Sequence, residues 1–198
     1  MSNNKGIISS SISLLSNVVN QGDSEDAKNV QSIIAGDAAA FKNLVVKYKK
    51  RVFSLGMSFF HNESDTDDFV QDVFIKVFTG LKSFRGDSRF STWLTRIAYN
   101  TAINAINRKK EYTSFTGEID LVDEEQVPER IHLREVTKQV IKEAIDSLPQ
   151  KYHVCLDMYF FYDMSYAEIA EVVNLPLNTV KSHVFRAKKI LREKLKEE

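Results

Sequence analysis

The chain has 198 residues, of which 43% are hydrophobic and 27% charged, as in a soluble globular protein with one or two domains that each bury a core. The single cysteine, Cys155, excludes an internal disulfide and is expected to be a buried, unreactive thiol. The formal net charge is zero, which taken alone argues against a nucleic-acid partner.

The charge is distributed unevenly along the chain. Residues 84–110 carry six basic and one acidic side chain, residues 111–135 carry two basic and eight acidic, and residues 177–198 carry seven basic and three acidic. Screening confines each field to about 8–10 Å in physiological salt, so local charge matters more than the total. Two basic segments separated by an acidic one therefore favour a nucleic-acid partner after all.

The N-terminal residues 1–24 lack the features of a signal peptide. They are expected to form a tail that is disordered or weakly helical. No apolar run approaches the roughly 20 residues of a membrane span. Glycine and proline are scarce, with 7 and 3 residues, which favours helix throughout. A short helix is expected at 26–35. Asp37 then caps a long helix to about residue 60, whose apolar side chains recur on one face: Phe41, Leu44, Val45, Tyr48, Val52 and Leu55.

The next predicted helix begins after an N-cap at Asp65 and runs to about residue 83, with acidic side chains suited to its first turn. One face is apolar and comprises Val70, Phe74, Val77 and Leu81, widened by Phe69, Val73 and Phe78. The opposite face is polar and carries Asp68, Gln71, Asp72 and Lys76.

The segment from Ser83 to Lys110 combines aromatic and basic side chains. Residues 85–88 predict a turn, followed by a helix from Phe90 to about Lys109. Aromatic rings stack on unpaired bases at about 1–3 kcal/mol per base, so a segment containing Trp93 suits nucleic acid whose bases are exposed. The alternative is that Trp93 and Phe90 belong to the core and that the arginines are merely solvated.

Residues 112–134 are rich in acidic and poor in large apolar side chains, and are predicted to form a flexible linker. Helix resumes near Pro128 and ends at Leu148, before Pro149. A further helix is expected at 150–160. No strand-like alternation and no internal repeat is found, so the predicted class is all-α, with two helical domains at 25–111 and 135–198 joined by the linker.

A helix-turn-helix is predicted in the C-terminal domain. Ser165 and Glu168 form a capping box that opens a short helix. Asn174 tolerates the left-handed conformation of a tight exit, and Pro176 suits the first turn of a following long helix. A short capped helix, a turn of about three residues and a long basic helix are the pattern of DNA-binding helix pairs.

On the second helix of this motif, the apolar and polar side chains lie on opposite faces. The expected buried face consists of Leu177, Val180, Val184, Ala187 and Leu191. Asn178, Ser182, Phe185, Arg186 and Lys189 lie opposite, with Lys181 at the flank. Amide, hydroxyl and guanidinium groups suit the major groove, and an exposed Phe can contact a thymine methyl. A solvated amphipathic helix with no partner is the alternative.

Two long stretches carry a resemblance to a known family. The stretch "DTDDFVQDVFIKVFTGLKSFRGDSRFSTWLTRIAYNTA" resembles region 2, and "IDSLPQKYHVCLDMYFFYDMSYAEIAEVVNLPLNTVKSHVFRAKKIL" resembles region 4, of bacterial RNA polymerase sigma factors of the extracytoplasmic-function class. The resemblance covers roughly residues 25–195. It implies a cytoplasmic initiation subunit that binds core polymerase, recognises −10 and −35 promoter elements and promotes melting of the DNA.

The resemblance also implies a role for particular residues. The polar face with Asp68, Gln71, Asp72 and Lys76 would dock on the clamp helices of the largest polymerase subunit, and the helices before Ser165 would meet the flap. The −10 element would be contacted by Phe84, Arg85, Gly86, Asp87, Ser88, Trp93, Asn100, Arg108, Lys109 and Lys110. The −35 element would be contacted by Asn178, Thr179, Lys181, Ser182, Phe185, Arg186 and Lys189.

Two domains on a linker also suit a clamping anti-sigma partner, which the resemblance leads us to expect. No cofactor, metal site, catalytic residue or membrane insertion is expected. Asn104, Tyr99 and Asn107 depart from residues that are common in the family, which bears on the −10 preference rather than on the fold.

Two functions of other classes are weighed against this one. A stand-alone helix-turn-helix regulator needs no aromatic segment at residues 84–100. An enzyme built on Asp65, Asp67, Asp68 and Asp72 lacks the His or Glu partners that metal sites on helices usually include.

Overall fold

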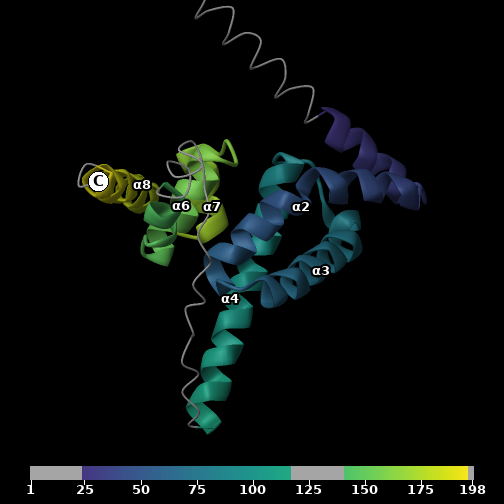
Figure 1. Ribbon diagram of the computed structural model, residues 1–198. Helices are drawn as coiled ribbons and strands as arrows, with labels where there is room; N and C mark the ends of the chain where they lie inside the picture. The colour runs from purple at the N-terminus through teal and green to yellow at the C-terminus, as the bar shows by residue number, and fades with distance from the viewer. Residues whose placement is uncertain (1–23, 117–140, 196–198) are drawn as a thin grey trace, which may run out of the picture.

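The computed structural model describes residues 24–116 and 141–195, with side chains described in these ranges except at 110–116. The described residues form helices joined by turns and contain no strand, which confirms the predicted all-α class. The N-terminal group comprises a helix at 24–34, α2, α3, the short η1 and α4. The C-terminal group comprises a helical segment at 141–146, α6, α7 and α8 (Figure 1).

Helix α2 (Ala38–Phe60) begins as the sequence predicts. The side chain of Asp37 accepts a hydrogen bond from the amide of Ala39 at 2.9 Å. The helix ends at His61, which adopts a left-handed conformation with φ 56°. The predicted apolar face is confirmed, because Leu44, Tyr48, Val52 and Leu55 are buried.

Helix α3 (Glu63–Gly80) begins three residues earlier than predicted, and the assignment of Asp65 as its N-cap is wrong. Asn62 is the cap, because its backbone is extended and its side-chain oxygen accepts from the amide of Asp65 at 2.8 Å. The 3₁₀ turn η1 (Leu81–Ser83) follows. The predicted stripe is buried apart from Phe78, which is 49% exposed because its ring lies at the edge of the core against Phe41.

Gly56 lets α2 and α3 approach closely. A Cβ atom at this position would lie 2.7 Å from Cδ1 of Phe69 and 2.8 Å from Cγ2 of Thr66. Both neighbouring atoms belong to buried side chains, which have little freedom to move in a densely packed core. The position therefore requires glycine for steric reasons.

Replacing Gly56 with alanine is expected to destabilise the N-terminal group by about 1–3 kcal/mol, the usual cost of overpacking a core. Gly80→Ala is the matched control, since a Cβ atom there would lie 3.5 Å from the Trp93 ring. That variant should be neutral or stabilising by up to about 1 kcal/mol. Urea denaturation followed by circular dichroism measures both, and equal midpoints for the two variants would contradict the close approach.

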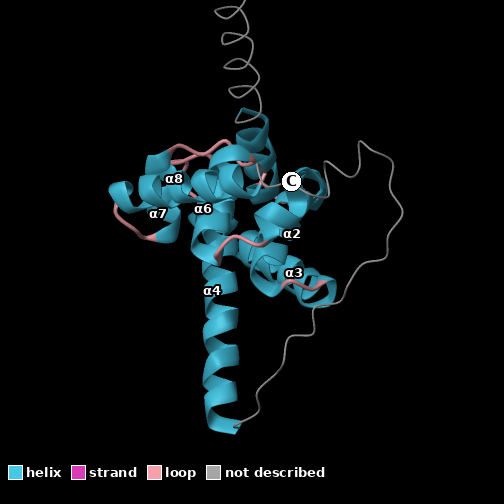
Figure 2. Cartoon of the chain, turned by 60° about the vertical axis from the view of Figure 1, so that its left-hand side comes forward, coloured by secondary structure: helices cyan, strands magenta, loops and turns pink. Residues whose placement is uncertain are grey.

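Helix α4 (Phe90–Thr116) is longer than predicted, and its C-terminal part projects away from both helix groups (Figures 1 and 2). Leu94, Ala98 and Ala102 are buried as predicted. The first residues of the predicted linker at 112–134 therefore belong to the α4 backbone, and the remainder lies outside the described residues. Of the predicted helix at 128–148, only the part from 141 is described; a turn at Ser147 and Leu148 ends its helical segment at 146.

The C-terminal group consists of α6 (Gln150–Phe160), α7 (Tyr166–Val173) and α8 (Leu177–Lys194) around a buried core. Its apolar residues are continuous with those of the N-terminal group, because Val154, Met158 and Tyr162 join the cluster that also contains Leu44 and Val52. The two predicted domains are therefore packed against each other, an arrangement that no feature of the sequence predicted.

Candidate nucleic-acid interface

The helix-turn-helix forms as the sequence predicts. The Ser165 side chain accepts from the amide of Glu168 at 3.2 Å, and the Glu168 carboxylate accepts from the amide of Ser165 at 2.9 Å. Asn174 ends α7 in the left-handed conformation with φ 53°. Pro176 is the residue directly before α8, and the amides of Thr179 and Val180 donate to its carbonyl. Local capping therefore sets the angle at which α8 leaves the turn.

Helix α8 presents a polar surface over a buried base. Val180, Val184 and Ala187 are buried, whereas Leu177, predicted on the same face, is 42% exposed because it lies at the open first turn of the helix. Thr179 is half-buried, and the other predicted −35 residues are exposed: Asn178, Lys181, Ser182, Phe185, Arg186 and Lys189. The structure thus brings them together on one accessible surface.

Arg186 is held in place by a neighbouring helix. Its Nη1 donates to the hydroxyl of Tyr152 on α6 at 3.2 Å. This hydrogen bond is the main reason that the pKa of Tyr152 is lowered. A guanidinium restrained in this way loses less conformational freedom when it binds a ligand.

Three aromatic rings pack together where η1 meets α4. The Phe84 ring lies 5.2 Å from Trp93 and 5.8 Å from Phe90, and Phe90 lies 5.8 Å from Trp93. Phe90 is buried, whereas Phe84 and Trp93 are half-buried. Phe90 is thus a core residue, and the other two combine a packing role with an accessible edge.

The loop that follows Phe84 is exposed at Arg85, Gly86, Asp87 and Ser88. Gly86 has φ 78°, a conformation that glycine adopts without the steric cost of a side chain. The aromatic cluster anchors one end of the loop and α4 begins at the other. The loop is therefore an accessible, restrained bend beside Trp93.

A polar stripe runs along α4 from this loop. Trp93, Asn100 and Asn107 are spaced by seven residues, which places them on one face of the helix. Asn100, Asn104, Asn107, Arg108 and Lys109 are all exposed. Lys110 belongs to the α4 backbone, and its side chain lies outside the described part. The stripe therefore places exposed amide and cationic groups along α4 beside the aromatic cluster.

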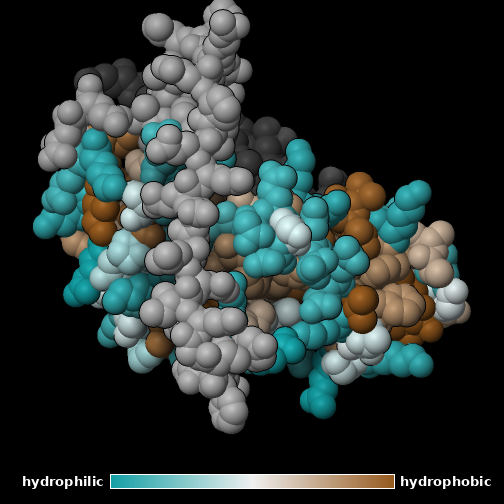
Figure 3. All heavy atoms as spheres, turned by 60° about the horizontal axis from the view of Figure 1, so that its bottom comes forward, coloured by the Kyte–Doolittle hydropathy of each residue, from teal (hydrophilic) through white to brown (hydrophobic). Residues whose placement is uncertain are grey.

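The predicted docking face of α3 is exposed at Asp68, Gln71, Asp72 and Lys76. Lys76 Nζ donates to Thr101 Oγ1 of α4 at 3.1 Å. Sequence reasoning missed Ile75, which is 62% exposed among these polar residues. The sequence could have indicated it, because Ile75 is an apolar residue that lies outside the predicted buried stripe. Figure 3 shows hydrophobic residues among hydrophilic ones at one end of the molecule.

The N-terminal end of α4 contacts α7 through Arg89, which the sequence analysis did not assign to any site. Its Nε donates to Glu168 Oε1 at 3.0 Å, and its Nη2 lies 2.8 Å from each carboxylate oxygen. Thr92 Oγ1 donates to Glu168 Oε1 at 2.9 Å. Burial alone raises the pKa of Glu168, but hydrogen bonds from Ser165, Arg89 and Thr92 outweigh it and lower the pKa to about 2.

This depressed pKa predicts a pH-dependent contribution to stability. The contribution to stability is present above pH 4.5, which is the usual pKa of a glutamate side chain. It is lost as the pH falls towards about 2, because protonation of Glu168 removes the charge that Arg89 binds. Relative to Glu168→Gln, the wild type is expected to be more stable by on the order of 1–2 kcal/mol at neutral pH, after discounting for solvent screening. Urea denaturation of both proteins across this range checks it. A constant difference down to pH 2 would contradict the assignment.

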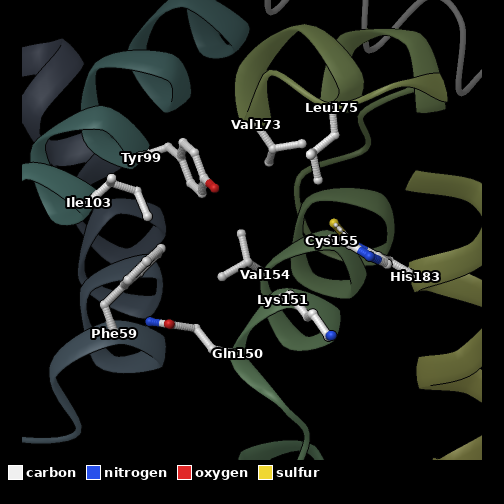
Figure 4. A pocket seen from close by; sticks show the side chains of 10 residues that line it. All are labelled: Phe59, Tyr99, Ile103, Gln150, Lys151, Val154, Cys155, Val173, Leu175 and His183. Atoms are coloured by element: carbon white, nitrogen blue, oxygen red, sulfur yellow. Dashed lines mark hydrogen bonds between the residues drawn. The ribbon is translucent and has the colours of Figure 1, made fainter. Parts of the chain in front are cut away.

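A cavity of about 190 Å³ lies between the two helix groups. Phe59, Tyr99 and Ile103 line it from the N-terminal group, and Val154 and Cys155 are among the residues on the other side (Figure 4). Cys155 is buried as predicted, and burial raises its pKa to about 11. Its Sγ lies 3.8 Å from Nδ1 of His183.

The described ranges contain no group of three or more His, Cys, Asp or Glu side chains arranged to hold a metal ion. Within the same ranges, no helix has the length and apolar character needed to cross a membrane.

Comparison with known proteins identifies the family. Residues 44–112 match the family model "Sigma-70 region 2", and residues 138–191 match "Sigma-70, region 4". The chain is 35% identical over 182 residues to the RNA polymerase sigma-H factor of Pseudomonas aeruginosa, with 86% of this chain and 94% of that protein covered. The chain belongs to the extracytoplasmic-function sigma factors of the sigma-70 family.

A second relative of this sigma factor is the ECF RNA polymerase sigma-E factor of Escherichia coli K12. It is 35% identical over 177 residues, with 84% of this chain and 92% of that protein covered. Family membership makes the chain an RNA polymerase sigma factor for promoter recognition. Because both regions match, a stand-alone helix-turn-helix regulator is not favoured.

Solved structures show the same all-α fold. The sigma factor RpoE, solved in complex with the anti-sigma factor NepR from Bartonella quintana, superposes with a TM-score of 0.66 and 21% identity over 79% of this chain and 96% of that one. CnrH, solved with the cytosolic domain of CnrY, superposes with a TM-score of 0.63 and 21% identity, covering 88% and 99% of the two chains.

Proposed function

We propose that this sigma factor directs core RNA polymerase to promoters through three separate surfaces. The exposed face of α3 docks on the clamp helices, the loop and polar stripe of α4 bind the opened −10 element, and α8 binds the −35 element. The sigma factor acts only by binding and catalyses no reaction itself. It acts in the cytoplasm. The single observation that carries the proposal is the exposed polar surface of α8 over a buried apolar base, in a helix-turn-helix that its own capping box orders.

The −35 contacts follow from the chemistry of α8. Arg186 can donate two hydrogen bonds to one base edge, Asn178 and Ser182 can donate and accept, and Phe185 is 68% exposed and can contact a thymine methyl. Lys181 and Lys189 neutralise phosphates and fix the register on the duplex. Helices before Ser165 then face the polymerase flap.

Opening of the −10 element uses the aromatic cluster and the stripe. Extraction of a base from a duplex costs a few kcal/mol, and stacking on an aromatic ring returns about 1–3 kcal/mol. The exposed loop 85–88 can hold such a base against the accessible edges of Phe84 and Trp93. Asn100, two turns along α4, donates and accepts hydrogen bonds at the next base.

Docking on polymerase uses both the polar and the apolar exposed side chains of α3. Asp68, Gln71 and Asp72 offer acceptors to cationic or amide partners, and Ile75 adds an apolar anchor at the centre of the face. An apolar centre with a polar rim is the usual anatomy of a protein interface. An anti-sigma factor is a further expected partner, because the RpoE and CnrH structures were solved with NepR and with the cytosolic domain of CnrY.

Replacing Asn100 with alanine is expected to impair promoter opening more than duplex binding, by about 1–2 kcal/mol, because its amide contacts a base only after strand separation. Permanganate reactivity of unpaired thymines measures opening, and a gel shift of the closed complex measures binding. Asn43→Ala, which removes an exposed amide of α2 outside the proposed DNA contacts, is the control. Equal losses in opening and in duplex binding for Asn100→Ala would contradict a melting role.

Run-off transcription tests the proposed function as a whole. Purified chain and core polymerase are incubated with a library of promoter fragments, and the transcripts are sequenced. We expect initiation from a subset that shares two separated sequence elements. If core polymerase with the chain initiates nowhere, in the absence of any inhibitor, the proposal is wrong.

A further inference from the structure

The cavity between the two helix groups has mainly apolar walls. Its apolar lining residues come from α2, α4, α6, α7 and the turn before α8, and they are Phe59, Ile103, Val154, Val173 and Leu175. Ordered water inside a protein needs about two to four polar contacts, and walls of this kind offer few. The lining therefore favours an organic ligand with an apolar body.

The size of the cavity limits the size of that ligand. An apolar cavity of about 150 Å³ is large enough to bind benzene. The cavity here has a volume of about 190 Å³, which suits one six-membered ring with a small substituent. The rings of Phe59 and Tyr99 lie edge to face with centroids 5.9 Å apart and form an aromatic wall (Figure 4). A flat ring packs well on such a wall, so the expected ligand is a small aromatic molecule.

The mouth of the cavity is positively charged. Gln150 and Lys151 are exposed lining residues in the first turn of α6, so the cavity opens to solvent there. No acidic side chain is found among the described residues that line it. His183 lies on the wall formed by α8, and its pKa is lowered first by burial and then by the charges of Lys151 and Arg186. The same two cations attract an anionic group on a ligand.

A hydrogen-bond donor points into the cavity. The hydroxyl of Tyr99 is directed towards its interior (Figure 4), and it makes no hydrogen bond to any described residue. Burial raises the pKa of Tyr99, so the hydroxyl keeps its proton at neutral pH. A partly buried donor of this kind is stabilised when a ligand supplies an acceptor.

We propose that this cavity binds a small aromatic carboxylate. The ring lies among the apolar side chains, the carboxylate lies at the mouth beside Lys151, and Tyr99 donates a hydrogen bond to a polar substituent of the ring. Because the walls belong to both helix groups, the ligand binds only while the groups are packed together, and its concentration favours that arrangement. The inference goes beyond the proposed function and does not depend on the promoter contacts.

Cys155 reports whether the site is occupied. It is the single cysteine of the chain and lines the cavity, so a bound ligand shields its thiol. The probes are benzoate and 4-hydroxybenzoate, with benzyl alcohol as the neutral control and acetate as the non-aromatic control. The rate at which the full-length chain reacts with 4,4′-dithiodipyridine, a reagent without a carboxylate, is measured at constant ionic strength over a concentration series of each probe.

Both aromatic carboxylates are expected to protect Cys155. A ligand of about nine non-hydrogen atoms should bind with a Kd of about 1 mM, so about 10 mM benzoate should slow the reaction about tenfold. Protection by 4-hydroxybenzoate should need a several-fold lower concentration, because its phenol oxygen accepts from Tyr99. Benzyl alcohol should protect less than benzoate, and acetate not at all. No protection by either carboxylate, or equal protection by benzyl alcohol, would overturn the proposal.

Val154→Phe tests the location of the site, because the larger side chain fills part of the cavity. This variant should show no protection by benzoate and no heat of benzoate binding in isothermal titration calorimetry. Circular dichroism checks that it remains folded. Wild-type binding of benzoate by the folded variant would place the ligand elsewhere and overturn the site.

Lys151→Gln tests the charge at the mouth without changing the core, since Lys151 is exposed. The Kd for benzoate should rise about fivefold, a moderate effect at a solvated position, whereas the Kd for benzyl alcohol should stay the same. Lys42→Gln, the same change at an exposed lysine of α2, is the matched control and should alter neither constant. An unchanged Kd for benzoate in Lys151→Gln would overturn the placement of the carboxylate.

Tyr99→Phe tests the hydrogen bond inside the cavity. The variant keeps the aromatic wall but lacks the donor, so it should bind benzoate and 4-hydroxybenzoate with equal Kd values. Calorimetric titrations of the wild type and the variant with both probes give the comparison. If Tyr99→Phe retained the wild-type preference for 4-hydroxybenzoate, the role of Tyr99 in the site would be wrong.

Discussion

Raising the salt concentration from about 50 to about 200 mM is expected to lower the affinity of the polymerase–sigma complex for promoter DNA by about 10³-fold, if about six phosphates are neutralised. The expectation follows from the basic side chains on two exposed surfaces, Arg108 and Lys109 on α4 and Lys181 and Lys189 on α8. Each releases a condensed counterion when it binds a phosphate. Filter binding or fluorescence anisotropy over a salt series gives the slope of log affinity against log salt.

Mutation separates the contribution of this chain to the salt dependence from the contribution of the polymerase. A variant with Arg108→Ala and Lys109→Ala should lower the slope by about 2, since each lost phosphate contact reduces it by about 0.9. Lys42→Ala, an exposed lysine on α2, is the control and should leave the slope unchanged. A flat salt response, or equal slopes for the double variant and the wild type, would remove the α4 residues from the interface.

The second large effect is expected from Arg186→Ala, which should weaken binding to the −35 element by about 1–3 kcal/mol, or roughly 5- to 150-fold, for each lost base contact. Arg186 is exposed on α8 and is oriented by its hydrogen bond to Tyr152. Its guanidinium can therefore meet a base edge with little further loss of freedom. Anisotropy of the polymerase–sigma complex on promoter duplexes measures the change, and selection from randomised −35 sequences measures the specificity.

Two variants of the same helix separate base recognition from charge. Arg186→Lys keeps the positive charge but cannot donate two parallel hydrogen bonds, so it should lose specificity while retaining much of the non-specific affinity. Arg192→Ala removes an exposed charge from the last turn of α8 and should weaken binding to all sequences by a similar, small factor. An unchanged promoter affinity in Arg186→Ala would exclude Arg186 from the −35 contacts.

Local rules explain which parts of the fold the sequence predicted correctly. The capping box at Ser165 and the left-handed exit at Asn174 involve residues within four positions of each other, so they form whatever the rest of the chain does. The error at the start of α3 is also local. Asn62 and Asp65 are both good N-cap residues three positions apart, and only the extended backbone at Asn62 decided between them.

Exposure at the edges of apolar stripes was predicted less well. Phe78 and Leu177 have the right spacing for burial, yet they are 49% and 42% exposed. Helical spacing places a side chain on a face, but the width of the covered part depends on the neighbouring helix. Ile75 shows the converse, an exposed apolar side chain on a face that the pattern described as polar.

The sequence by itself determined the helical class, the order of the helices and the polar surfaces of α3, α4 and α8, because these depend on periodicity and capping over a few residues. Only the tertiary structure decided that the two helix groups pack against each other and that Glu168, recognised locally as a capping residue, also binds Arg89. That contact joins residues 79 positions apart. No short-range pattern encodes it, because it depends on how two complete surfaces meet.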